Sequence, residues 1–92
     1  MYERDSARVA AGVQFKFGRR VRQLRLAAGL TQEDLAHTCG LFRTYMSRIE
    51  TGQANPTLTM IYAIATSLKV PVAHLFEADT VAKPQSRRTS TD

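Results

Sequence analysis

Residues 31–52 constrain the fold most, because their sequence, TQEDLAHTCGLFRTYMSRIETG, predicts two short helices joined by a tight turn. Thr31 is a favoured N-cap residue, and Asp34 follows three positions later in a variant of the capping box that starts a helix. Gly40 permits the sharp turn that follows, and Gly52 would end the second helix. The segment therefore predicts a compact helix pair, and the chain contains no convincing strand pattern.

The predicted helix at residues 42–51 has two chemically different sides. With roughly 100° between successive residues, one side collects apolar side chains, namely Phe42, Tyr45, Met46 and Ile49. The other side collects polar and basic side chains within roughly 140°, namely Arg43, Thr44, Ser47, Arg48 and Thr51. The apolar side would pack in a core, while the polar side carries donors of the kind that reach base edges and phosphates.

Three further segments carry helical patterns. Apolar residues recur at intervals of three or four from Val13 to Ala28, which predicts a helix that Gly29 ends. Thr57 would cap a fourth helix with a broad apolar face, and Pro71 would start a short fifth helix. The sequence therefore predicts an all-α fold, a compact domain of five helices.

The chain divides into one domain and two flanking segments. We expect residues 1–12 to form an N-terminal arm or a helical extension, because they mix charged with small residues. Residues 13–78 would form the domain. Residues 79–92 are polar and lack apolar periodicity, so we expect a disordered basic tail.

Length, hydrophobic content and net charge limit the classes of protein to which this chain could belong. The 92 residues suit one domain, and 43% are hydrophobic, enough for a modest core. The net charge of +5 favours an anionic partner such as nucleic acid or a membrane surface, although charge alone is a weak signal. Apolar stretches are too short to cross a bilayer, and the N-terminus lacks a secretory signal. The single Cys39 fits a reducing cytoplasm, which is the location we expect.

Catalytic and metal-binding patterns do not occur in the sequence. His37 and His74 stand at no metal-ligand spacing from a cysteine or carboxylate, so we expect no metal site. The sequence has neither a phosphate-binding glycine loop nor a nucleophile elbow, so we expect neither an enzyme nor a cofactor. We also expect no small-molecule ligand, because no second domain is predicted to hold one.

The pattern of residues resembles the lambda-repressor-like helix-turn-helix family, also called the xenobiotic-response-element family. The segments that carry the resemblance are Phe17–Arg25, Gly29–Ala36, Gly40–Leu41, Ser47–Gly52 and Asn55–Leu58. They cover about residues 14–77, and their combined spacing is highly specific. Within the family, the small size and the run at 43–47 are similar to controller proteins of restriction–modification systems. Phe42 departs from the pattern, because relatives usually place a capping Ser, Asp or Thr there.

The resemblance implies that the helix at 42–51 enters the major groove of DNA. The expected DNA-binding residues are Thr31, Gln32, Arg43, Thr44, Tyr45, Ser47, Arg48 and Thr51. Arg43 could donate twice to guanine, a contact worth about 1–3 kcal/mol of discrimination, with a phosphate contact as its alternative. Gln32 could hold the DNA backbone or reach toward the recognition helix. Tyr45 lies between the two sides, so its ring could pack in the core while its hydroxyl touches a phosphate.

The resemblance also implies two structural features. Arg25 and Glu50 would form an ion pair that links the first helix to the end of the recognition helix. A homodimer interface would lie on the last two helices and include Met60, Val72, Leu75 and Phe76. Two-fold symmetry would then require a palindromic operator with half-sites about 34–36 Å apart.

The sequence therefore predicts a homodimeric transcription regulator most similar to restriction–modification controller proteins. Its expected partners are double-stranded DNA with a palindromic operator, a second copy of the chain and, as a further candidate, RNA polymerase. One alternative is an antitoxin of the same fold that binds a toxin and regulates its own operon. Another is a catalytic or structural role in which the basic surface is incidental.

Overall fold

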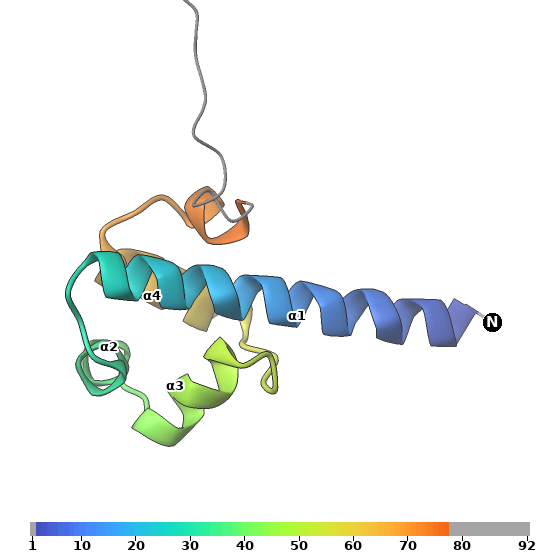
Figure 1. Ribbon diagram of the computed structural model, residues 1–92, viewed down its shortest axis with the longest axis horizontal. Coiled ribbons are helices and arrows are strands. Elements are labelled where there is room, and N and C mark those ends of the chain that lie inside the picture. The colour runs from blue at the N-terminus through green and yellow to red at the C-terminus, as the bar shows by residue number, and fades with distance from the viewer. Residues whose placement is uncertain (1, 78–92) are drawn as a thin grey trace, which may run out of the picture.

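The computed structural model describes residues 2–77 of the chain, with side chains described from residue 7 onward. This part is all-helical, as predicted. Its elements are α1 (Tyr2–Ala27), α2 (Gln32–Cys39), α3 (Arg43–Glu50), α4 (Leu58–Leu68) and the 3-10 helix η1 (Val72–Phe76). In Figure 1, α2 and α3 lie on one side of α1, and η1 lies on the opposite side. The predicted tail at 79–92 lies outside the described residues.

Helix α1 begins at Tyr2, well before the start at Val13 that the apolar stripe predicts. Of the two forms considered for the N-terminal segment, residues 2–12 have the helical one. Figure 1 shows this end of α1 projecting beyond the body of the molecule, and Val13 is half exposed. Apolar periodicity reports burial rather than helix formation, so it could not reveal a part of the helix that has no core beside it.

One hydrophobic core joins all the elements. Its buried members are Phe17, Val21, Leu35, Ala36, Met46, Ile49, Ala54, Ile64, Ala65, Leu68 and Leu75. Each of the five elements contributes at least one of these side chains. Burial of one large aliphatic side chain stabilises a fold by about 1.5–3 kcal/mol, so the shared core fixes α2 and α3 against α1 and α4.

Two helix starts are capped as predicted. The Thr31 hydroxyl accepts the backbone N–H of Asp34 at 3.0 Å, and the Asp34 carboxylate accepts the backbone N–H of Thr31 at 3.0 Å. Thr57 accepts the backbone N–H of Met60 at 3.1 Å and starts α4. The bond from the Thr31 backbone, followed by that from its side chain, lowers the pKa of Asp34. At pH values above the unfolded-state pKa of Asp34, its ionised carboxylate therefore stabilises α2. This stabilisation is lost as the pH falls through the lower folded-state pKa.

The last element differs from the prediction in two ways. It is a 3-10 helix rather than an α-helix, and Leu75 is fully buried. Residues three apart share one side of a 3-10 helix, so Val72 and Leu75 both turn toward the core. Leu75 was expected at a dimer interface, and this expectation is wrong because the chain's own core already covers the side chain. Phe76 is 56% exposed, with its ring 5.3 Å from that of Phe17.

None of the described helices is both long enough and apolar enough to span a membrane.

Gly18 provides a test of how tightly α1 packs on α3. A Cβ atom at this position would lie 2.7 Å from the carbonyl oxygen of Glu50 and closer still to that of Ile49. We expect Gly18→Ala to lower the free energy of unfolding by about 1–3 kcal/mol, because two backbone segments would have to separate. Urea denaturation followed by circular dichroism measures this loss.

Gly12→Ala is the matched control in the same helix. Gly12 is exposed, and a Cβ atom there meets nothing within 4 Å, so alanine should raise stability by up to about 1 kcal/mol through its helix propensity. Equal effects of the two variants would contradict the close contact between α1 and α3.

Candidate nucleic-acid interface

The turn between α2 and α3 is fixed by the backbone. Gly40 adopts a left-handed conformation with φ 74°, which glycine accepts without steric strain. The N–H of Leu41 donates to the carbonyl of Ala36 at 2.8 Å, and that of Gly40 donates to His37 at 3.1 Å. These bonds satisfy the end of α2 and set the direction in which α3 leaves.

Helix α3 has one buried and one exposed side. Met46 and Ile49 have at most 1% of their surface exposed and lie in the core, while Tyr45 is partly buried against it. Five residues on the polar side of the predicted helix at 42–51 were expected to face DNA. Four of them are exposed and the fifth, Ser47, is half-buried; the exposed ones are Arg43, Thr44, Arg48 and Thr51. The structure therefore brings these five residues together on the side of α3 that points away from the core.

Phe42 does not lie where the helical projection puts it. We expected this ring on the apolar side of α3, but it is 84% exposed. Phe42 is the N-cap residue, with an extended backbone at φ −78° and ψ 150°, and its side chain makes no capping bond. A projection at 100° per residue does not apply to an N-cap, because that residue stands outside the helix.

A buried ion pair holds the far end of α3. The Nε of Arg25 donates to one carboxylate oxygen of Glu50 at 2.7 Å, and its Nη2 donates to the other at 3.0 Å. Their side chains are only 7% and 1% exposed. Arg25 also donates to the carbonyl of Leu30 at 2.8 Å, and the Gln32 amide donates to Glu50 at 3.1 Å. The network thus links α1 and the start of α2 to the Glu50 carboxylate at the end of α3.

The Gln32 amide thus reaches toward α3, which is the second of the two roles considered for it. Thr31 is exposed, and its hydroxyl oxygen accepts only the capping bond in the described residues. Its hydroxyl hydrogen can be donated to a phosphate. The Thr51 hydroxyl differs, because it donates back to the carbonyls of Ser47 and Arg48 at 3.0 and 3.3 Å.

The charges around α3 are mainly positive. Arg43 and Arg48 are exposed, and the one carboxylate of α3 is neutralised by Arg25. On α1, the exposed cations include Lys16, Arg19 and Arg22. Arg43 and Arg48 therefore give the exposed side of α3 a positive charge, which attracts an anionic ligand.

Arg20 has a structural role that the sequence did not reveal. It is buried, donates to the carbonyl of His74 at 2.7 Å and pairs with Glu77 at 3.1 Å. The guanidinium thus ties α1 to η1 and to the residue that follows it. Arg20 lies within a strongly basic run, and no feature of that run distinguishes a solvated arginine from one that bridges distant elements.

The described residues contain no cluster of His, Cys, Asp or Glu suited to a metal ion. The Cys39 thiol lies 3.5 Å from the Ser67 hydroxyl, and burial raises the pKa of Cys39. A raised pKa keeps the thiol protonated and therefore weakly nucleophilic at neutral pH.

The contribution of the Arg25–Glu50 ion pair to stability can be measured. Arg25→Met leaves the buried Glu50 carboxylate without its main partner, so we expect the free energy of unfolding to fall by about 3–5 kcal/mol. Adding Glu50→Leu removes the isolated charge and should recover much of this loss. Urea denaturation of the single and double variants measures both effects.

Glu77→Gln serves as the control, because it weakens an ion pair in which the Glu77 side chain is 46% exposed. Exposed pairs contribute about 0–1 kcal/mol, so this change should be small. An equally small loss in Arg25→Met would contradict the role given to the buried pair.

Comparisons with known proteins agree with this geometry. Residues 16–77 match a family described as a helix-turn-helix domain. The control protein C.BamHI of Bacillus amyloliquefaciens is 36% identical over 77 residues, which cover 83% of this chain and 95% of that protein. The control protein C.MunI of a Mycoplasma species is 34% identical over 65 residues, covering 70% and 88% of the two chains.

Solved structures give the same result. The crystal structure of the restriction–modification controller protein C.AhdI from Aeromonas hydrophila is similar, with 46% identity and a TM-score of 0.67. The match covers 68% of this chain and 96% of that chain. The family match spans more than half of the sequence and contains both helices of the interface, the turn and the buried ion pair. The chain therefore belongs to the helix-turn-helix family of DNA-binding transcription regulators, and its relatives include restriction–modification controller proteins.

Proposed function

We propose that this chain is a controller-type transcription regulator that binds a palindromic operator as a homodimer. The observation that carries the proposal is the exposed polar side of α3, which faces away from the core while Met46 and Ile49 hold the helix in place. Relatives named as control proteins favour a controller over the antitoxin alternative. The proposed location is the cytoplasm, where the operator would be accessible.

The residues of α3 have different roles in this proposal. Arg43 and Thr44 lie at the N-terminal end of the helix, the end that enters the major groove in this docking mode, and contact base edges. Ser47 lies one turn further and faces the groove floor. Arg48 lies to the side and contacts a phosphate or a flanking base, while the half-buried Tyr45 offers its hydroxyl to a phosphate.

Residues near the helix ends hold the DNA backbone. Thr31 donates its hydroxyl to a phosphate, and Gln32 positions the start of α2 beside it. Thr51 contributes less, because its hydroxyl hydrogen already has carbonyl acceptors within α3. Phosphate contacts release counterions, so they supply much of the affinity and make it depend on salt. Base contacts then select the sequence.

A second copy of the chain would cover apolar surface on α4 and η1. Phe76, Tyr62 and Leu58 are each more than half exposed, and a second copy would remove this apolar surface from water. Of the residues expected at the interface, Met60 and Val72 are partly buried against the core, so they contribute only their remaining surface. Phe76 is the main expected contact.

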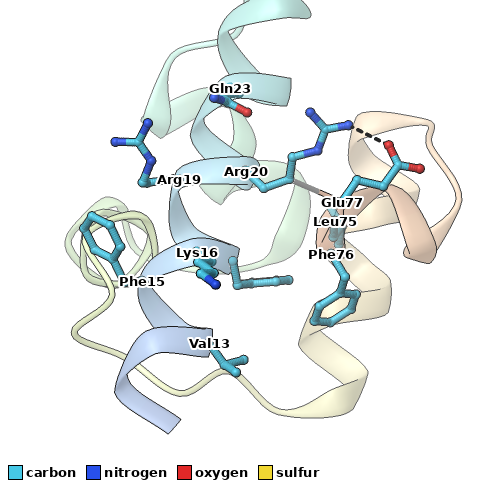
Figure 2. Close-up of a pocket in the computed structure, with 10 residues that line it drawn as sticks. Val13, Phe15, Lys16, Arg19, Arg20, Gln23, Leu75, Phe76 and Glu77 are labelled. Carbon is cyan, nitrogen blue, oxygen red and sulfur yellow. Dashed lines mark hydrogen bonds and ion pairs between the residues drawn. The ribbon is translucent and has the colours of Figure 1, made fainter. Parts of the chain in front are cut away.

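Phe76 also forms one wall of a groove between α1 and η1 (Figure 2). The groove has a volume of about 510 Å³, and the exposed apolar residues of its lining include Val13 and Phe15. The Arg20–Glu77 ion pair lies beside it and fixes η1 against α1. The groove therefore gives a second copy a preformed apolar surface on the side of α1 opposite to α3.

Control of transcription would follow from where the operator lies. A dimer that covers the promoter would exclude RNA polymerase, whereas one bound upstream could contact it. RNA polymerase is therefore a candidate partner of the DNA-bound dimer. The concentration of the regulator itself would set the occupancy of the operator.

Selection of binding sites from random duplex DNA tests the sequence specificity. We expect the chain to select a palindrome, and Arg43→Ala to lose preference at one base pair in each half-site. Loss of a bidentate contact should weaken specific binding by about 1–3 kcal/mol per half-site. The affinity is measured by fluorescence anisotropy at several salt concentrations.

Lys69→Asn is the control for loss of one positive charge away from α3. Lys69 is exposed with φ 60° at the end of α4, a conformation that asparagine tolerates. This variant should keep the selected sequence. An Arg43→Ala variant that selects the same sequence with unchanged affinity would contradict the role of α3.

The homodimer is tested by sedimentation equilibrium. Phe76→Ser should shift the chain toward the monomer, because it removes an exposed large apolar side chain of η1 from the proposed interface. Leu26→Ser removes a side chain that is 52% exposed on α1 and should leave the dimer intact. A wild-type chain that stays monomeric and binds one copy per operator would contradict the proposal.

A further inference from the structure

We propose that Phe42 contacts the C5-methyl group of a thymine in the major groove and thereby helps to determine the operator sequence. The inference rests on the proposed function, because it assigns a base contact to a residue of the same interface. No other large apolar side chain among the described residues is as exposed, since Phe42 is 84% exposed and Leu58 follows at 70%.

Phe42 stabilises neither the core nor the start of its own helix. Its ring lies outside the hydrophobic core, and its side chain makes no bond to the first turn of α3. Only its backbone takes part in the helix, since its carbonyl accepts the N–H groups of Tyr45 and Met46 at 3.1 Å. An N-cap without a side-chain acceptor weakens a helix start, and the exposed ring adds unfavourable contact with water.

The position of Phe42 indicates what the exposed ring would contact in a complex with DNA. It directly precedes Arg43 and Thr44, which are exposed at the N-terminal end of the recognition helix. In Figure 1 this first turn of α3 lies at the outer edge of the body, away from α1. A helix docked with this end in the major groove therefore carries the ring to the base edges together with Arg43.

The chemistry of the groove identifies the base. The edges of guanine, adenine and cytosine in the major groove present hydrogen-bond donors and acceptors, whereas thymine adds an apolar methyl group. A phenyl ring offers no conventional hydrogen bond, so it favours the methyl group and would desolvate the polar edges without compensation. The ring therefore selects thymine beside the base pair that Arg43 contacts.

Replacement of single thymines by deoxyuridine in the selected operator tests this contact, because it removes only the methyl group. We expect one thymine in each half-site at which the replacement weakens wild-type binding by about fourfold, the effect of one buried methyl-sized group. The same replacement should leave the affinity of Phe42→Ser unchanged. Phe42→Leu keeps an apolar side chain and should retain part of the effect.

Thermal unfolding of Phe42→Ser checks that the variant is folded. Serine can cap α3, so we expect its melting temperature to equal or exceed that of the wild type. Lys69→Asn is the binding control and should show the wild-type response at every thymine. The fluorescence anisotropy titrations use the full chain throughout.

Three outcomes would overturn the inference. In the first, the wild type selects a palindrome, but every thymine replacement changes the affinity of the wild type and of Phe42→Ser equally. The proposed function then stands without this contact. In the second, Phe42→Ser changes the oligomeric state without DNA, which would assign the ring to a protein interface. In the third, the wild type selects no sequence, and the proposed function fails together with the inference.

Discussion

The buried pair of Arg25 and Glu50 is the interaction on which the interface depends. Helix α3 has only eight residues, so it is too short to be stable alone and takes its position from its neighbours. Met46 and Ile49 fix its buried side, while Glu50 fixes its end through two bonds from Arg25 and one from Gln32. The buried Glu50 carboxylate would lose some of these three hydrogen bonds if it moved. The end of α3, and with it the orientation of its exposed side relative to α1, is therefore fixed.

This arrangement gives one short helix a buried side that stabilises the fold and an exposed side for the proposed contact with DNA. The buried side is apolar and closely packed, so it tolerates little change in volume. The exposed side contributes little to the core, and in the proposed function its residues contact DNA. Phe42 stands at the start of this exposed side and belongs to the surface rather than to the core. Its chemistry suits a partner that offers an apolar group.

The sequence predicted the elements whose signals are local. The capping box at Thr31 and the cap at Thr57 involve residues three apart, so the pattern and the structure coincide. The all-helical fold followed from apolar periodicity and from the family resemblance. The position of Phe42 was mispredicted because a helical projection ignores the extended backbone of an N-cap. Burial of Leu75 and the bridging role of Arg20 depend on packing between α1 and η1, which neither residue's local sequence encodes.

In the proposed function, the exposed side of α3 contacts DNA while its buried side and the ion pair hold the helix in place. Backbone amide chemical shifts of the ¹⁵N-labelled chain, recorded during titration with its selected duplex, test this claim most directly. We expect the largest changes at residues 42–48 and at Thr31 and Gln32, with small changes in η1. Large changes confined to α4 and η1, with those of α3 unaffected, would contradict it.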